Sequence, residues 1–282
     1  MMASVATMSV TAMLSYRYNG LLFTVPTLID DGLILRPQSR RKVMGNSLIL
    51  QSVGEVWDIG SLATVREPVV IDSVPDHIQF SSPKSIRILD MPVKFPGEDY
   101  RLPLDAVQFM ATIQSVIDYE HSINSNADDC YAYLTVDQGY IEAGATQRKQ
   151  GCHVDGFQGA RVTKKLPINR SYVVSDMVPT AFYVQPFHVE RLDERYDNFF
   201  SEFDRQAQPE RVWHPSPYDI TLMDAYTVHK AETTPCPVYR TFLRLSYTMR
   251  IFDRLGNAHN PLFDYQWEMV SRDTQSELVD VL

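Results

Sequence analysis

Between residues 130 and 252 the 282-residue chain carries about eight short segments with the composition of β-strands, separated by turn residues. One helical insert, residues 193–206, interrupts them, and its aromatic side chains Tyr196, Phe199, Phe200 and Phe203 recur on one face. Many short strands with a single helical excursion favour two packed antiparallel sheets. We therefore predict a mainly β protein with flanking helices, whose core is a double-stranded β-helix (a cupin-like jelly roll). The candidate strands are residues 131–136, 150–154, 171–175, 180–187, 211–214, 219–223, 227–232 and 239–252.

The region before this core predicts short strands followed by one helix. Residues 20–25, 47–53 and 85–89 have strand composition between Pro and Gly residues. Residues 103–121 predict a helix with a core-facing stripe at three- and four-residue spacing, formed by Leu104, Val107, Met110, Ile113 and Ile117. We expect a flexible N-terminus over residues 1–17 and a single domain over 18–282, with the jelly-roll core at about 130–252.

Charge and cysteine content limit the partners and the compartment. A formal net charge of −9 argues against broad binding to nucleic acid or to an anionic membrane, since both need a basic surface. No apolar run is long enough to span a bilayer, and no basic residue precedes Arg17 to form a signal peptide. Three cysteines provide no even disulfide framework. We expect a cytoplasmic protein, and the sequence does not predict its oligomeric state.

Two His-x-acid pairs are candidates for a metal site. A chain with 7 histidines and 35 acidic residues should contain about one such pair by chance, and this one contains His153-Val-Asp155 and His188-Val-Glu190. In a jelly roll the pair lies on an early strand and a third ligand on a late one. Only the first pair leaves room for the intervening strands before His229. Residues two apart on a strand project to the same side, so we predict that His153, Asp155 and His229 bind one metal ion.

The last predicted strand carries arginines on one face. In residues 239–252, Arg240 and Arg244 alternate with Leu243 and Leu245, which belong to the opposite face. A buried guanidinium needs an anion, and a carboxylate satisfies it through a bidentate pair. An edge strand with solvated arginines is the alternative explanation.

The complete motif resembles that of the Fe(II)/2-oxoglutarate-dependent oxygenases. It consists of His153-x-Asp155, His229, and Arg244-x-Ser246 fifteen residues after His229. Members of this superfamily have the jelly-roll fold, and their Arg-x-Ser pair binds the distal carboxylate of 2-oxoglutarate. Arg240, eleven residues after His229, matches the arginine position of the taurine dioxygenase-like branch. Both assignments stay open here, and Arg244 is favoured because Ser246 accompanies it.

The resemblance implies Fe(II), 2-oxoglutarate and O2 as cofactors, with ascorbate as a supporting reductant. The reaction it implies is oxidation of a small organic substrate, coupled to decarboxylation of 2-oxoglutarate to succinate and CO2. Related halogenases have Gly or Ala in place of the carboxylate, so Asp155 favours hydroxylation, desaturation or cyclisation.

Further candidates surround the motif. Tyr131 and Tyr133 are candidate cosubstrate contacts, and Phe157, Gln158 and Arg161 are candidate substrate contacts. Basic residues bracket the motif and would suit an anionic substrate, although a solvated loop explains such a run equally well. They are Arg148, Lys149, Arg161, Lys164, Lys165 and Arg170.

Three other functions remain possible from the sequence. The run Arg244-x-Ser246-x-Thr248-x-Arg250 is similar to that of the AlkB-type nucleic-acid demethylases, with Ser where those carry Asn, but the acidic net charge opposes that branch. A metal-dependent cupin that is not an oxygenase would need the histidines and not the arginines. If the chain were instead a binding protein without metal, its His-x-Asp pair would be a coincidence.

Overall fold

The computed structural model describes residues 13–18, 21–26, 57–75, 77–80, 85–148, 150–156, 167–189, 192 and 198–270. The predicted strand at 47–53 and the candidate substrate contacts Phe157, Gln158 and Arg161 lie outside these residues. Part of the N-terminal segment expected to be flexible, residues 13–17, lies in a strand that pairs with the segment after it.

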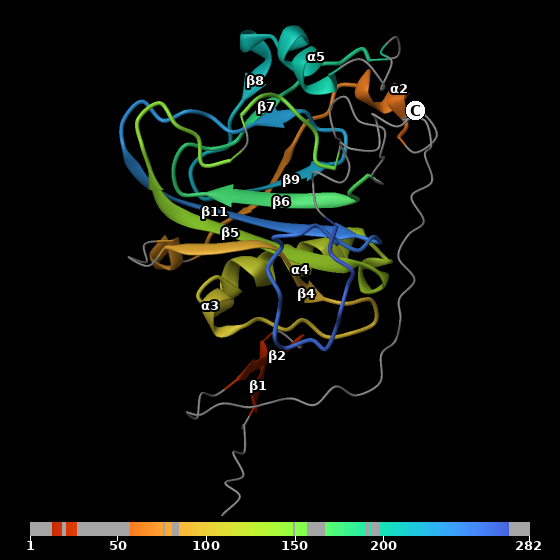
Figure 1. Cartoon of the computed structure of the whole chain (residues 1–282), viewed down its shortest axis with the longest axis vertical. Coiled ribbons are helices and arrows are strands. Elements are labelled where there is room, and N and C mark those ends of the chain that lie inside the picture. Colours follow the sequence, from red (N-terminus) through yellow and green to blue (C-terminus); the bar gives the residue numbers. More distant parts are fainter. Residues whose placement is uncertain are drawn as a thin grey trace, which may run out of the picture.

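The described chain is mainly β, as the sequence predicts (Figure 1). Its helices are α2 (Ile59–Leu62), α3 (Leu104–Val107), α4 (Met110–Ile123) and α5 (Phe199–Gln206), with short 3-10 turns at His77–Phe80, Ala127–Asp129 and Pro209–Arg211. Its strands are β1 (Met13–Tyr18), β2 (Leu21–Pro26), β3 (Val69–Ser73), β4 (Ile86–Lys94), β5 (Tyr131–Ile141), β6 (Arg170–Ser175), β7 (Ala181–Tyr183), β8 (Val212–Trp213), β9 (Asp219–Asp224), β10 (His229–Lys230) and β11 (Val238–Thr248).

Two antiparallel sheets form the core. The larger has the strand order β3-β9-β6-β11-β5-β4, and the smaller has the order β10-β7-β8. An antiparallel bridge between His153 and His229 adds the segment around His153 to the smaller sheet, next to β10. From β5 onwards the chain alternates between the sheets: β5, the His153 bridge, β6, then β7 and β8, β9, β10 and β11. This alternation is the winding of a double-stranded β-helix, so the predicted jelly roll is correct.

Several predicted elements are shorter or divided in the structure. Residues 180–187 contain only the three-residue β7, because the Gln185 amide turns back to donate to the Tyr183 carbonyl and Pro186 has no amide for a ladder. The predicted 150–154 strand is reduced to the His153 bridge. The helix predicted at 103–121 is two helices, α3 and α4, separated at Phe109, whose ring is fully buried. Its stripe is buried at Ile113 and Ile117, whereas Leu104 is exposed.

Helix α4 covers the outer face of the large sheet (Figure 1). Ile113, Val116 and Ile117 pack against alternate residues of β5 and β11, including Leu134 and Leu243. Burying each such side chain contributes roughly 1.5–3 kcal/mol. The opposite residues of these two strands, among them Arg240 and Arg244, therefore point towards the smaller sheet.

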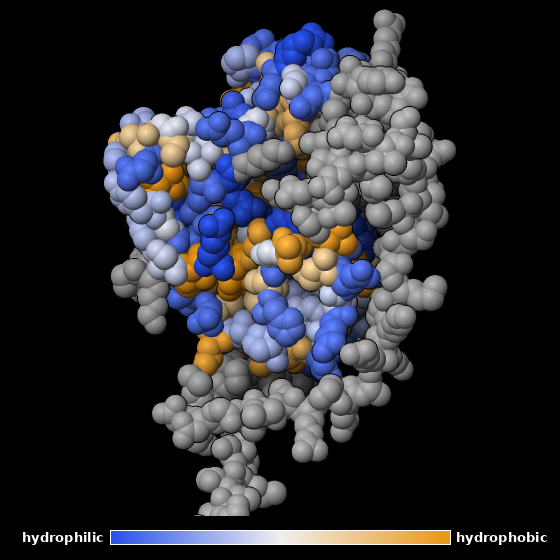
Figure 2. All heavy atoms as spheres, viewed as in Figure 1, coloured by the Kyte–Doolittle hydropathy of each residue, from blue (hydrophilic) through white to orange (hydrophobic). Residues whose placement is uncertain are grey.

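Helix α5 covers the smaller sheet and is part of the insert predicted at 193–206. The Asn198 side chain caps it by accepting hydrogen bonds from the amides of Phe200 and Ser201. Phe199 and Phe203 are buried against Cys152 and Val228, and the polar side of the helix produces the hydrophilic surface at the top of Figure 2. This packing holds the segment that carries the candidate ligands.

Candidate metal centre

His153, Asp155 and His229 meet at one point between the two sheets. One nitrogen or carboxylate oxygen from each lies within 4.8 Å of the others, and no other three-residue His, Cys or acidic cluster of this kind occurs in the part of the chain that the structure describes. Nε2 of His229 is 3.9 Å from Oδ1 of Asp155. The two histidines are brought together by their backbones, because each amide donates to the other's carbonyl oxygen at 2.9 Å.

Backbone carbonyls fix both imidazole rings. Nδ1 of His153 lies 2.9 Å from the carbonyl oxygen of Gly151, and Nδ1 of His229 lies 2.9 Å from that of Thr227. A carbonyl oxygen can only accept, so each Nδ1 must carry the proton. Each Nε2 is then left with its lone pair for a cation, as in metal-binding histidines generally. The donor set fits a divalent metal held by two nitrogens and one carboxylate.

The turn before His153 depends on a glycine. Gly151 has φ +86, and a Cβ placed there would lie 2.9 Å from Oδ2 of Asp204. The other carboxylate oxygen of Asp204 accepts the amide of Cys152 at 2.8 Å, so helix α5 clamps this turn. Gly156 also has φ +86, which agrees with the sharp departure expected after the ligand pair.

The turn before His229 is held by Asp224. Its Oδ1 accepts hydrogen bonds from the Tyr226 amide at 2.9 Å and the Thr227 hydroxyl at 2.8 Å. This Asx-type turn places the Thr227 carbonyl under the imidazole of His229. Both ligand-bearing turns are therefore fixed by hydrogen bonds that need no metal.

Asp155 is paired with a guanidinium. Nη1 of Arg244 lies 2.8 Å from Oδ2 of Asp155, and Nη2 of the same side chain lies 2.7 Å from Oδ1 of Asp90. Burial by itself would raise the pKa of Asp155, but the charge of Arg244 outweighs burial and holds the pKa well below its usual value. The carboxylate is thus ionised, with one oxygen engaged and the other facing His229.

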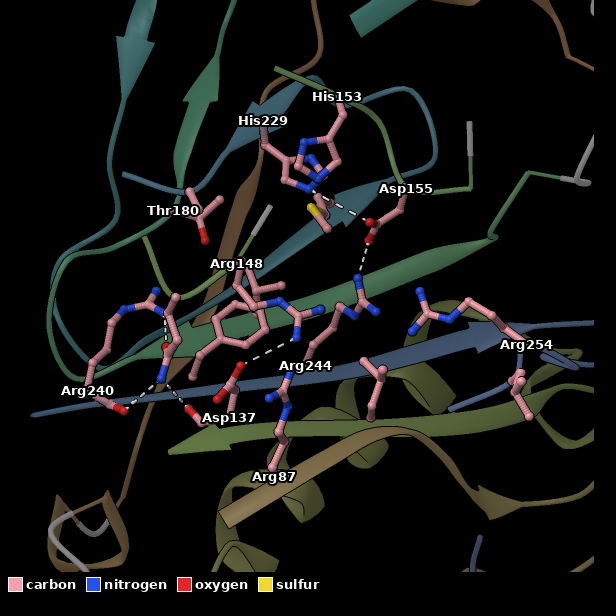
Figure 3. Close-up of a pocket in the computed structure, with 17 residues that line it drawn as sticks. Arg87, Asp137, Arg148, His153, Asp155, Thr180, His229, Arg240, Arg244 and Arg254 are labelled. Carbon is pink, nitrogen blue, oxygen red and sulfur yellow. Dashed lines mark hydrogen bonds and ion pairs between the residues drawn. The ribbon is translucent and has the colours of Figure 1, made fainter. Parts of the chain in front are cut away.

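A cavity of about 430 Å³ opens beside the three ligands (Figure 3). Its volume is in the range of small-molecule sites, roughly 300–1,000 Å³. Arginines dominate its polar lining: Arg87, Arg148, Arg240, Arg244 and Arg254. In the view of Figure 3, Arg240 and Thr180 lie at one end of the cavity, Arg254 at the other, and Arg148 and Arg244 between them.

Arg240 is a buried cation that forms no ion pair with the described carboxylates, although the charges of Asp176 and Asp137 partly offset its burial. Its Nε donates to the carbonyls of Met177 and Val178 at 2.7 and 3.1 Å, and its Nη1 donates to the Gln147 side chain. Only 4% of the residue is exposed. Burial without full compensation lowers the pKa of Arg240 to about 10. Among the described residues, Nη2 donates no hydrogen bond, so this end of the guanidinium is available to an anion.

Three of the predicted cosubstrate contacts lie away from the cavity. The Ser246 hydroxyl is fully buried, 2.9 Å from that of Ser171. The Tyr133 hydroxyl donates to the Arg250 carbonyl and accepts the Phe252 amide. Tyr131 packs with Tyr133 in an aromatic cluster around Trp267. None of the three is among the residues that line the cavity.

The structure divides the remaining candidates from the sequence into residues that line the cavity and residues that lie elsewhere. Arg148 of the basic cluster lines the cavity, whereas Arg170 pairs with the buried Glu120 elsewhere. His188, from the competing His-x-acid pair, is exposed, and its backbone amide donates to the Gln206 side chain of α5. It is not part of the three-residue cluster. Asp90, Thr180 and Gln147 were not identified from the sequence. Nothing in their local sequence distinguishes them, since their place depends on pairings between distant strands.

Fold and site together define a class: a double-stranded β-helix protein with two histidines and one carboxylate arranged for a metal. No family model and no curated protein matches the sequence. Solved structures do. A 2OG-Fe(II) oxygenase family oxidoreductase from Burkholderia pseudomallei matches at 12% identity over 70% of this chain and 79% of its own, with a TM-score of 0.33. The non-heme alpha-ketoglutarate-dependent epimerase SnoN from nogalamycin biosynthesis matches at 13% over 73% and 93%, with a TM-score of 0.35.

EvdO2 from Micromonospora carbonacea var. aurantiaca matches at 16% identity over 50% of this chain and 64% of its own, with a TM-score of 0.28. The family named for the first structure is the one that the sequence motif resembles. These similarities are weak in identity and in TM-score, so the fold assignment rests on the strand order of this chain itself. Among the described residues, no helix combines the length and apolar character needed to cross a bilayer.

Proposed function

We propose that the protein is an Fe(II)- and 2-oxoglutarate-dependent oxygenase that oxidises a small organic substrate. One observation carries this proposal: the candidate metal ligands, two histidine Nε2 atoms and one carboxylate, line the same cavity as Arg240, a buried guanidinium whose charge is only partly compensated. His153, Asp155 and His229 would hold the iron. When bound, Fe(II) supplies the redox chemistry that couples O2 to decarboxylation of 2-oxoglutarate.

Arg240 is the residue we assign to the distal carboxylate of 2-oxoglutarate. Arg244, favoured on sequence because Ser246 accompanies it, already pairs with Asp155 and Asp90, and Ser246 lies outside the cavity lining. Arg240 instead lines the cavity with an Nη2 that donates to no described residue, and Thr180 lies at the same end of the cavity (Figure 3). A guanidinium whose orientation is fixed by other hydrogen bonds suits a carboxylate geometrically.

The substrate we propose is a small anion, and hydroxylation is the reaction that the carboxylate ligand favours. Among the described residues, five arginines line the cavity, against Asp137 and Asp155 in the lining and Asp90 behind Arg244, which leaves two positive charges in excess. The charges of Fe(II) and of the 2-oxoglutarate dianion would cancel each other, so the excess of positive charge remains for the substrate. Arg148 is the arginine of this set that pairs with Asp137, with 3.8 Å between its Nη1 and Oδ2 of that carboxylate.

Release of succinate tests the proposed function. Purified protein with Fe(II), ascorbate and 2-oxoglutarate should form succinate slowly without a substrate, and His153→Ala or Asp155→Ala should abolish it. His188→Ala is the matched control, because it removes the histidine of the other His-x-acid pair, and it should leave the rate unchanged. Metal binding without succinate would instead support a cupin enzyme that is not an oxygenase. No metal binding at all would support a binding protein.

The charge of the substrate is tested with matched pairs of a carboxylic acid and its amide. Each is added to the succinate assay as a candidate substrate. Acids should stimulate succinate release and their amides should not, because only the acids match the excess of arginines in the cavity. Stimulation by amides alone would contradict an anionic substrate.

A further inference from the structure

We propose that Arg244 and Asp90 are positioning residues that orient the Asp155 carboxylate, so that Asp155 offers the metal a single oxygen. This inference rests on the proposed metal site. It assigns to Arg244 a role other than cosubstrate binding, and it gives a role to Asp90, which lies 65 positions before Asp155 in the sequence.

The contacts form one continuous chain of buried charges. Arg244 extends from β11 with Nη1 on Oδ2 of Asp155 at 2.8 Å and Nη2 on Oδ1 of Asp90 at 2.7 Å. The three side chains are only 11–13% exposed. Each end of the guanidinium is therefore held by a carboxylate, and the side chain has little freedom to turn towards another anion.

Asp90 is itself held in place by the strand that neighbours β11. The Thr135 hydroxyl donates to Oδ1 of Asp90 at 2.9 Å and accepts the Asp90 amide at 3.0 Å. Thr135 is the residue of β5 directly opposite Arg244 in the antiparallel register. Arg254 adds a second positive charge, 3.8 Å from Oδ2 of Asp90. Three separate strands or loops thus converge on this carboxylate.

The backbone at Asp90 is distorted in a way that ordinary strand residues avoid. The pairing of β4 with β5 shifts register between Ile88 and Met91, and Asp90, inside this bulge, has φ +45. A positive φ is unfavourable for a residue with a side chain, and bulges typically redirect a side chain near a functional site. Here the bulge turns the Asp90 carboxylate towards Arg244. The unfavourable conformation and the ion pair therefore have one explanation.

The consequence for the metal site is geometric. With Oδ2 of Asp155 taken by Arg244, Oδ1 is the oxygen that faces Nε2 of His229. One-oxygen coordination keeps positions around the metal open for cosubstrate, whereas a carboxylate that turned freely would bind through both oxygens and fill one of them. Hydrogen-bond partners of ligands commonly change metal affinity by about 10–100-fold.

Anaerobic titration with Co(II) tests this role without any catalytic turnover. Asp90→Asn keeps the size of the side chain and tolerates positive φ, but removes the charge that holds Arg244. Asp90→Gly removes the side chain and relaxes the backbone, which offsets part of the cost of the lost ion pair, and a thermal melt checks that the variant folds. We expect both variants to weaken Co(II) binding about 10-fold or more and to change the visible absorption of the bound Co(II).

Two further variants separate this role from the alternatives. Asp137→Asn removes another cavity carboxylate, one paired with Arg148 and not with Arg244, and should leave the Co(II) affinity and spectrum unchanged. Arg244→Lys should change the Co(II) spectrum while Co(II)-loaded protein still binds N-oxalylglycine, a redox-inert analogue of 2-oxoglutarate.

The outcomes are distinct. Unchanged Co(II) affinity and spectrum in both Asp90 variants would overturn the proposal, as would loss of N-oxalylglycine binding in Arg244→Lys with the Co(II) spectrum intact. Failure of the unsubstituted protein to bind Co(II) would instead remove the metal site, and the proposed function with it.

Discussion

Replacing Arg240 by methionine should weaken the binding of 2-oxoglutarate strongly and leave metal binding intact. Arg240 is 4% exposed, and three hydrogen bonds to Met177, Val178 and Gln147 hold its guanidinium in one orientation. A carboxylate bound to Nη2 would thus be a buried, charge-assisted partner. Truncating one member of such a pair costs about 2–5 kcal/mol, which corresponds to roughly a 30- to 4,000-fold loss of affinity.

The same replacement should have a small effect on folding without ligand. The variant loses three hydrogen bonds, but it also removes a buried charge that Asp176 and Asp137 compensate only in part, and burial lowers the pKa of Arg240 for the same reason. These two effects oppose each other. The cosubstrate affinity should therefore change far more than the free energy of unfolding.

Calorimetric titration of Zn(II)-loaded protein with 2-oxoglutarate measures the effect directly. Arg240→Lys should give an intermediate affinity, because lysine keeps the charge but not the planar fork. Arg87→Met is the matched control, since Arg87 lines the same cavity but is exposed. A loss of less than about threefold in Arg240→Met, or an equal loss in Arg87→Met, would refute the assignment of Arg240 to the cosubstrate.

Three further predictions concern the rest of the fold. Glu120 is fully buried and accepts hydrogen bonds from Arg170 and Tyr172. Glu120→Ala should therefore lower the free energy of unfolding, measured in urea, by about 3 kcal/mol and leave the Co(II) affinity unchanged. A loss of stability below about 1 kcal/mol would contradict this prediction. Burial raises the pKa of Cys152 to about 12 and also raises that of Cys130, whereas Cys236 is exposed. Native protein at pH 8 should therefore react with one equivalent of Ellman's reagent, and Cys236→Ser should abolish that reaction; a second fast thiol would disagree. Burial raises the pKa of Asp176 above its ordinary value of 3.8, so the native state takes up this proton at higher pH than the unfolded state, and the ionised carboxylate destabilises the fold at neutral pH. Asp176→Asn should accordingly be more stable at pH 7, with a gain that shrinks as the pH falls towards 3.8; a gain independent of pH would oppose this account.

The sequence alone predicted the β-helix and the three candidate ligands. Both depend on short-range periodicity: strand residues two apart project to the same side, which places His153 with Asp155 and separates Arg240 and Arg244 from Leu243 and Leu245. The structure confirms that division, because Leu243 and Leu245 pack under α4 while both arginines line the cavity. The spacing to His229 favoured His153-x-Asp155 over His188-x-Glu190, and the structure brings the first pair and His229 together.

Only the tertiary structure decided which contacts each arginine makes. Arg240 and Arg244 share a strand face and lie roughly 13 Å apart along it, so no local pattern tells which one meets the metal ligand. That choice depends on the register of β11 against β5 and on the bulge that turns Asp90 inward. Asp90 is an acidic residue in an ordinary strand sequence, and its positive φ arises from a pairing irregularity between β4 and β5. Alternation within a strand is encoded locally, whereas the contacts across strands exist only once the sheet has formed.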